Sequence, residues 1–138
     1  MQRINARIIR WSRNWWAHLA CAIASVLSFQ SLLFIGDRFA AVTGGYRPFD
    51  LQNPLGRGDI MAQLPTYSAT SRNLYWIFIG ADMIFPLVGA VPLMLLLSRV
   101  LQAIEEPWSA IASNRGLALT PFLLTVLDWV ENAFFVAT

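Results

Sequence analysis

Long apolar segments alternate with shorter polar ones along this chain. The apolar segments are residues 17–36, 74–98 and 117–138. An α-helix rises about 1.5 Å per residue, so segments of about 20 residues match the ~30 Å hydrocarbon core of a bilayer. Because a spanning segment must satisfy its own backbone polar groups, each segment is predicted to be a helix. The pattern therefore predicts an all-α membrane protein, with a small bundle of three transmembrane helices in one domain.

An amphipathic pattern precedes the first span, within residues 1–16. Apolar and basic side chains occupy opposite faces of a helix there: Ile4, Ile8, Trp11 and Trp15 against Arg3, Arg7 and Arg10. This arrangement predicts an N-terminal amphipathic interfacial helix, with arginines toward anionic headgroups and tryptophans at the lipid boundary. The alternative is a signal peptide. The Trp15–Trp16 pair and the full bilayer length of the following span favour an uncleaved anchor.

Composition agrees with a lipid environment. Hydrophobic residues make up 57% of the 138 residues and charged residues only 13%, against about 25% charged residues in ordinary globular domains. The net charge of +2 is small and scattered, which argues against a nucleic-acid surface. One cysteine, Cys21, excludes an intrachain disulfide, and one histidine, His18, excludes a histidine-based metal site. We expect no metal and no cofactor.

Arginine placement predicts the orientation. Six arginines lie before the first span or in the connector 99–116: Arg3, Arg7, Arg10, Arg13, Arg99 and Arg115. The other four lie in the longer connector 37–73, mixed with aspartates: Arg38, Arg47, Arg57 and Arg72. The positive-inside rule therefore favours a cytoplasmic N-terminus, with 37–73 as the outer loop and 99–116 as the inner loop. The Gly- and Pro-rich start of the outer loop, through Asp59, predicts turns, and Pro65 a short interfacial helix.

Acidic and amide side chains interrupt two of the spans. Asp82 lies in the second span with Pro86 one turn later, while Asp128, Glu131 and Asn132 lie in the third. With the second span descending from the outer side, Asp82 is about 12 Å below the outer edge. Glu131 lies at nearly that level in the third span, and Asp128 lies one turn deeper. The acids of the two helices are therefore predicted to meet.

Two interpretations of these acids stay open. A charged side chain in mid-membrane costs from about 3 kcal/mol upward, so three carboxyl groups in one region require a shared proton, a bound cation or polar partners. The acids either form a hydrogen-bonded clasp between helices or line a ligand or proton site. Our candidates for chemistry are Asp82, Asp128, Glu131 and Asn132, and our candidates for ligand binding are Asp50, Tyr75 and Pro86.

Three segments carry a resemblance to a known family: YRPFDLQ, ADMIFPLVGAVPL and LTPFLLTVLDWVENAF. They resemble a widespread family of uncharacterised bacterial integral membrane proteins with an FD element, an Asp followed by FP, and an intramembrane D-x-x-E-N motif. The family's motif residues fall on Phe49 and Asp50, on Asp82, Phe85 and Pro86, and on Asp128, Glu131 and Asn132. The resemblance covers roughly residues 46–135 and implies the bacterial inner membrane.

Members of that family usually have a fourth span, which this chain lacks. We therefore expect either a truncated chain or a partner that supplies the missing helix, as a second copy or another subunit. The bilayer is the one partner that composition predicts directly.

The function classes that remain differ in how accessible the acids are. A binding, structural or accessory protein would use the acids to hold helices or a ligand. A membrane enzyme would use a carboxylic acid and a carboxylate on a lipid-like substrate, in distant analogy to the emopamil-binding isomerases. A proton or cation carrier is a further alternative. A pocket that reaches the acids would favour chemistry or binding over a closed clasp.

Overall fold

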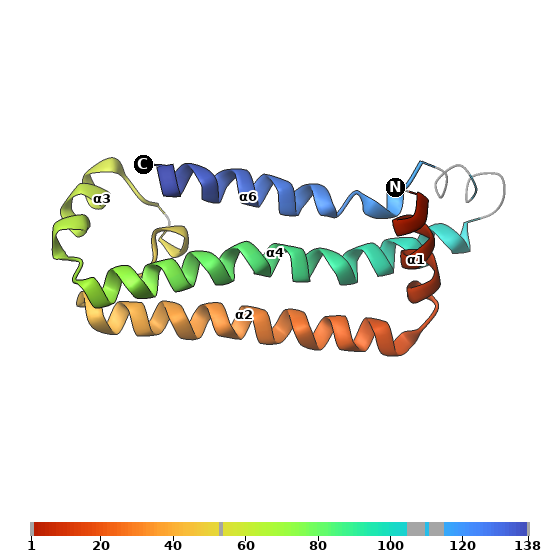
Figure 1. Cartoon of the computed structure of the whole chain (residues 1–138), viewed down its shortest axis with the longest axis horizontal. Helices are drawn as coiled ribbons and strands as arrows, with labels where there is room; N and C mark the ends of the chain where they lie inside the picture. The colour runs from red at the N-terminus through yellow and green to blue at the C-terminus, as the bar shows by residue number, and fades with distance from the viewer. Residues whose placement is uncertain (1, 53, 105–109, 111–114, 138) are drawn as a thin grey trace. The chain divides into compact units, whose positions relative to one another are not determined.

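The computed structural model describes residues 2–52, 54–104, 110 and 115–137. All regular structure among these residues is helical (Figure 1). Three helical segments are long and apolar enough to cross a membrane: α2 (Trp15–Thr43), α4 (Ala69–Ala103) and the segment Leu117–Phe134. The third segment comprises the short helix η3 (Leu117–Leu119) and most of α6 (Phe122–Ala137). The predicted all-α membrane fold is confirmed.

The chain forms two compact units. Unit 1 contains Met1–Leu27 and Met83–Thr138, and unit 2 contains Ser28–Asp82. The division between the units falls inside α2 and inside α4. Unit 1 therefore holds α1 (Gln2–Ser12), η3 and α6 with one part of each long helix, and unit 2 holds the other parts and the connector between them.

The two long helices extend beyond the predicted spans. Helix α2 continues past Gly36 to Thr43, and α4 begins at Ala69 and ends at Ala103. The spans were placed by apolarity, whereas a helix satisfies its own backbone in water and in hydrocarbon alike, so a polar turn can continue it. Helix α4 also takes residues 99–103 of the predicted inner loop; residues 105–109 and 111–114 of that loop lie outside the described residues.

The predicted turns of the outer loop are partly wrong. Helix η1 (Phe49–Leu51) and helix α3 (Arg57–Gln63) occupy much of it. Helix α3 begins where it does because the Asp59 carboxylate accepts a hydrogen bond from the Gly56 N–H at 2.8 Å, which satisfies a donor at the helix start. Pro65 lies inside the short helix η2 (Leu64–Thr66) and does not begin a longer one.

The short N-terminal helix α1 is amphipathic, as predicted. Ile4 and Trp11 are exposed, and so are the arginines of the opposite face. The buried positions are polar, Asn5 and Ser12. Helix α1 therefore packs on unit 1 through polar groups and leaves its apolar and basic faces outward, as an interfacial helix requires.

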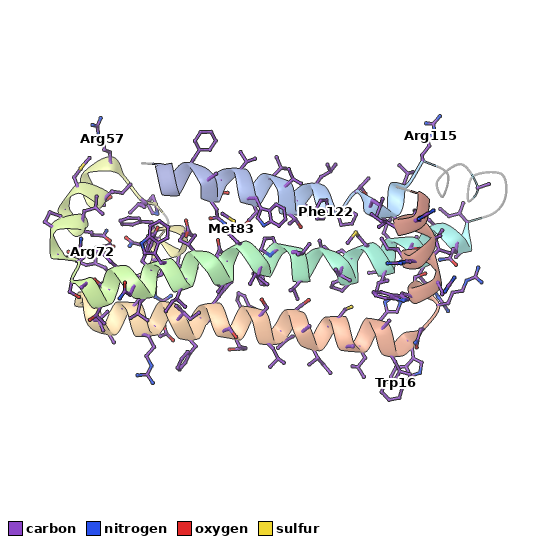
Figure 2. The ribbon with its side chains drawn as sticks, viewed as in Figure 1. Trp16, Arg57, Arg72, Met83, Arg115 and Phe122 are labelled. Carbon is purple, nitrogen blue, oxygen red and sulfur yellow. The ribbon has the colours of Figure 1, made fainter. Side chains whose placement is uncertain are left out.

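Large apolar side chains cover the outside of the spanning helices. On α6 the most exposed are Leu123 at 61%, Leu127 at 66% and Phe134 at 69%. Similar exposure is found along α2 and α4. Contiguous apolar surface of this extent is rare on soluble monomers but is what lipid solvates. At the start of α2, Trp16 projects outward (Figure 2), and it stacks on Trp15 with ring centroids 3.8 Å apart. The protein is thus placed in a membrane.

Helix α2 ends in a glycine-dependent turn. Gly44 has a φ of 76°, and the Gly45 N–H donates to the Ala40 carbonyl at 2.8 Å. This hydrogen bond across six residues, with a left-handed residue just after the helix, is the Schellman motif. Glycine is needed at position 44 because a residue with a Cβ is strained at this positive φ. The strain comes from the residue's own backbone, since no other atom lies within 4 Å of the Cβ position.

Gly44→Ala should therefore destabilise the protein by about 1–2 kcal/mol, the cost of a left-handed residue with a Cβ. Gly58→Ala is the matched control, since Gly58 also has open space around it but lies within α3 at an ordinary φ. The control should be neutral or stabilising by up to about 1 kcal/mol. Denaturant unfolding in detergent micelles measures both, and equal effects of the two substitutions would contradict this assignment.

Candidate functional site

A polar stripe runs along α6 in unit 1. Thr125 and Asn132 are buried, with 0% and 3% of their surface exposed, and Asp128 between them is half-buried. The Asn132 side-chain N–H donates to the Asp128 carboxylate at 3.1 Å. The stripe exists because positions three and four apart lie on one helical face. Asp128 and Asn132, two of our candidates for chemistry, are thus brought together on this face.

Glu131 lies on another face of α6. Its side chain is exposed, whereas that of its neighbour Asn132 is buried. Successive residues of an α-helix are about 100° apart around its axis, so adjacent side chains diverge. The structure therefore separates Glu131 from the stripe.

Neutral donors connect α6 to α4 within unit 1. The Thr125 hydroxyl donates to the Pro86 carbonyl at 3.0 Å, and the Trp129 indole N–H donates to the Met83 carbonyl at 2.7 Å. A backbone carbonyl has two lone pairs, so the Pro86 and Met83 carbonyls can accept these bonds in addition to a bond within their own helix. The Phe122 ring packs edge-on against Trp129 at 6.1 Å. Figure 2 labels Met83 and Phe122 on these helices.

An aromatic cluster forms the centre of unit 2. We define it as Phe39 of α2, Phe49 of η1, Tyr67 before α4 and Tyr75 within α4. The Phe39 ring lies edge-on to Tyr67 at 5.3 Å, and Phe49 lies edge-on to Tyr75 at 5.6 Å. Phe39 is fully buried, and Phe49 and Tyr67 are 8% and 9% exposed. Edge-to-face pairs at these separations stabilise beyond the area that they bury.

Two carboxyl groups adjoin this cluster. Both carboxylate oxygens of Asp50 are buried, as is the Tyr75 phenol oxygen. Asp50 and Asp82 both lie close enough to Tyr75 to act on it electrostatically. Unit 2 thus gathers a buried acid from the outer loop, a phenol and an acid from α4. Two of our ligand-binding candidates, Asp50 and Tyr75, are brought together with the chemical candidate Asp82.

A glutamine pair is hydrogen-bonded to the aromatic cluster through Tyr67. Gln52 and Gln63 exchange two side-chain hydrogen bonds of 2.9 Å each, and the Tyr67 hydroxyl donates to Gln63 at 3.3 Å. Burial, and to a smaller degree Tyr46, raises the pKa of Tyr67 from 10 to about 12. Tyr67 therefore remains a neutral hydrogen-bond donor throughout the physiological range.

The predicted contact between the acids of α4 and α6 stays a prediction. Asp82 belongs to unit 2, whereas Asp128 and Asn132 belong to unit 1. Pro86, our third ligand-binding candidate, contributes a backbone acceptor to the α4–α6 connection in unit 1. Within the described part of the chain, no three His, Cys, Asp or Glu side chains gather as metal ligands would.

Sequence reasoning overlooked Trp129 and the glutamine pair. Tryptophan in an apolar span normally signals lipid contact, and the useful signal was its position four residues after Thr125, facing a proline-containing helix. Gln52 lies within the segment predicted as turns and Gln63 lies beyond it, so no spacing rule related them.

Comparison of the chain with protein-family models, with curated proteins and with solved structures gives no match in any of the three.

Removing the Thr125 hydroxyl tests the α4–α6 connection. Thr125→Val keeps the shape but loses the donor to Pro86, and should destabilise the protein by roughly 0.6–1.7 kcal/mol, the range for hydrogen bonds between membrane helices. Thr120→Val is the control, because the exposed Thr120 hydroxyl bonds only to Leu117 in its own turn. Equal losses in detergent unfolding experiments would show that Thr125 does not connect the helices.

Proposed function

We propose that this protein is an integral membrane binding protein whose ligand site is the acid-lined aromatic cluster of unit 2. The observation that carries the proposal is the burial of the Asp50 carboxylate beside Tyr75 and its aromatic neighbours, with Asp82 acting on the same phenol. A charge taken out of water is costly, and proteins retain it mainly where it serves a site.

The chemistry of this cluster suits an amphipathic cation. The carboxyl groups attract a positive or hydrogen-bond-donating group, and aromatic rings attract cations over their faces. The rings of Phe39, Phe49 and Tyr67 also offer apolar surface. A ligand with an ammonium group on an apolar body would satisfy both requirements.

In unit 1, neutral donors contribute to the connection between α4 and α6: Thr125 donates to the Pro86 carbonyl and Trp129 to the Met83 carbonyl. Asp128 is bonded within its own helix by Asn132.

A second candidate function is a membrane enzyme. It is favoured by one observation, the two carboxyl groups that act on the single phenol of Tyr75. One of them as an acid and the other as a carboxylate could give and take a proton on a lipid-like substrate. The residues in these roles would be Asp50 and Asp82.

We further propose the bacterial inner membrane as the location, with a cytoplasmic N-terminus. The arginine distribution supports the orientation. The FD, D-x-x-F-P and D-x-x-E-N segments support membership of the four-span family that they resemble.

Reporter fusions test the orientation. Fusions after Arg13 and near Asn114 should report the cytoplasm, and a fusion near Gly58 the periplasm, because arginine-rich flanks stay inside. The opposite pattern of reporter activity would reverse the orientation.

A cationic amphiphile tests the binding site. Small amounts of dodecyltrimethylammonium in dodecyl maltoside micelles should raise the unfolding temperature of the wild type, since a ligand at about 100 times its Kd stabilises by about 2.7 kcal/mol. Asp50→Asn and Asp82→Asn should each remove most of this rise, because an amide carries no charge.

Asp37→Asn is the matched control. Asp37 is an exposed acid of the same unit, 3.6 Å from Arg47, and its loss should leave the stabilisation intact. Dodecanol, with the same chain and no charge, should not stabilise. Equal stabilisation of the wild type and Asp50→Asn would exclude the proposed site. If the amphiphile still stabilises Tyr75→Phe but this variant fails to complement a deletion strain, the enzyme is favoured.

A further inference from the structure

A polar network joins α1 to the end of α4 in unit 1. The Gln102 amide N–H donates to the Ser12 hydroxyl at 2.8 Å and also to the Ser98 carbonyl at 3.0 Å. The Ser98 hydroxyl donates to Ser12 at 3.3 Å. Ser12 and Ser98 are 1% and 2% exposed. Gln102 is therefore fixed in orientation by buried partners.

This orientation positions a guanidinium group. The Arg13 Nε–H donates to the Gln102 side-chain oxygen at 3.0 Å. That hydrogen bond uses one edge of the guanidinium and leaves the two terminal nitrogens outward. The terminal edge of a guanidinium matches two oxygens of a phosphate.

A cavity lies beside this arginine. It is open on one side, is lined by Arg13, Arg99, Gln102 and Ala103, and has a volume of about 340 Å³. Among residues 2–52, 54–104, 110 and 115–137, one ion pair is found, between Arg47 and Asp37 in unit 2. No carboxylate of that part of the chain therefore neutralises Arg13 or Arg99.

Neighbouring tryptophans mark the depth of this cavity. Trp11, Trp15 and Trp16 are 56%, 60% and 60% exposed and flank Arg13 in the chain. Exposed tryptophans of membrane proteins concentrate at the headgroup level. The cavity thus opens where lipid phosphates are found.

We propose that this cavity binds the phosphate of an anionic phospholipid, with Arg13 and Arg99 as its ligands. Basic pockets between spanning helices on the cytoplasmic side are suited to such headgroups. The C-terminus of α4 opposes an anion with about half a charge, which two guanidinium groups outweigh. The Gln102 network holds Arg13 ready, so little ordering is needed on binding. This inference does not depend on the proposed function of unit 2.

Native mass spectrometry of the full chain, released from nanodiscs with equal phosphatidylglycerol and phosphatidylcholine, tests the proposal. The wild type should retain phosphatidylglycerol preferentially. Arg13→Gln with Arg99→Gln should weaken that retention about 30-fold, from the loss of two arginine–phosphate interactions. The control, Arg3→Gln with Arg7→Gln, removes the same charge from exposed positions of α1 and should leave the preference in place. Equal losses for the two double variants would overturn the site.

Ala103→Glu provides a variant that keeps both arginines. A carboxylate at this cavity-lining position should pair with them and displace the lipid while circular dichroism shows an unchanged helical content. Undiminished lipid retention by the folded Ala103→Glu protein would contradict the proposal. Inorganic phosphate distinguishes the source of the anion. If inorganic phosphate alone raises the unfolding temperature of the protein fully, and phosphatidylglycerol raises it no further, free phosphate is the ligand and the lipid assignment is overturned.

Discussion

Hydrocarbon offers no hydrogen-bond partner to a peptide group, and this constraint governs how the spanning helices are built and joined. A regular helix meets it internally, but α4 carries Pro86 and Pro92 within its length. Each proline removes a donor from the helix. Near Pro86 the neighbouring helix adds donors, because Thr125 bonds to the Pro86 carbonyl and Trp129 to the Met83 carbonyl. These two bonds hold α6 with Asn132 buried and Glu131 exposed.

The helical membrane fold was predictable because lipid imposes one requirement on every residue of a span. The lengths of apolar segments sufficed for that conclusion. Helix ends were less predictable: α3 begins at Arg57 through the single bond from Gly56 to Asp59, within a segment whose glycines and prolines indicate turns. A segment of this composition can form either a turn or a short helix, and the capping contact between Gly56 and Asp59 favours the helix.

The candidate site was predictable where it depended on helical spacing and unpredictable where it depended on the connector. The relation of Asp128 to Asn132 follows from a four-residue step along one helix. The grouping of Asp50 with Tyr75 and Asp82 requires η1 to fold back onto α4, and no periodicity encodes that. The side of α6 on which Glu131 lies depends on which face packs against α4, which the position of Trp129 fixes.

The attachment of α1 to α4 has a mechanical consequence. Ser12 is bonded to both Ser98 and Gln102, so α1 is tied to the end of a 35-residue helix. A helix of this length exceeds the thickness of the hydrocarbon core and adapts to bilayers of different thickness by tilting. Because the tie passes through short side chains, any tilt of α4 changes the depth and angle of α1 among the headgroups. The hydrogen bonds to Ser12 therefore couple the position of the basic face of α1 to the tilt of α4.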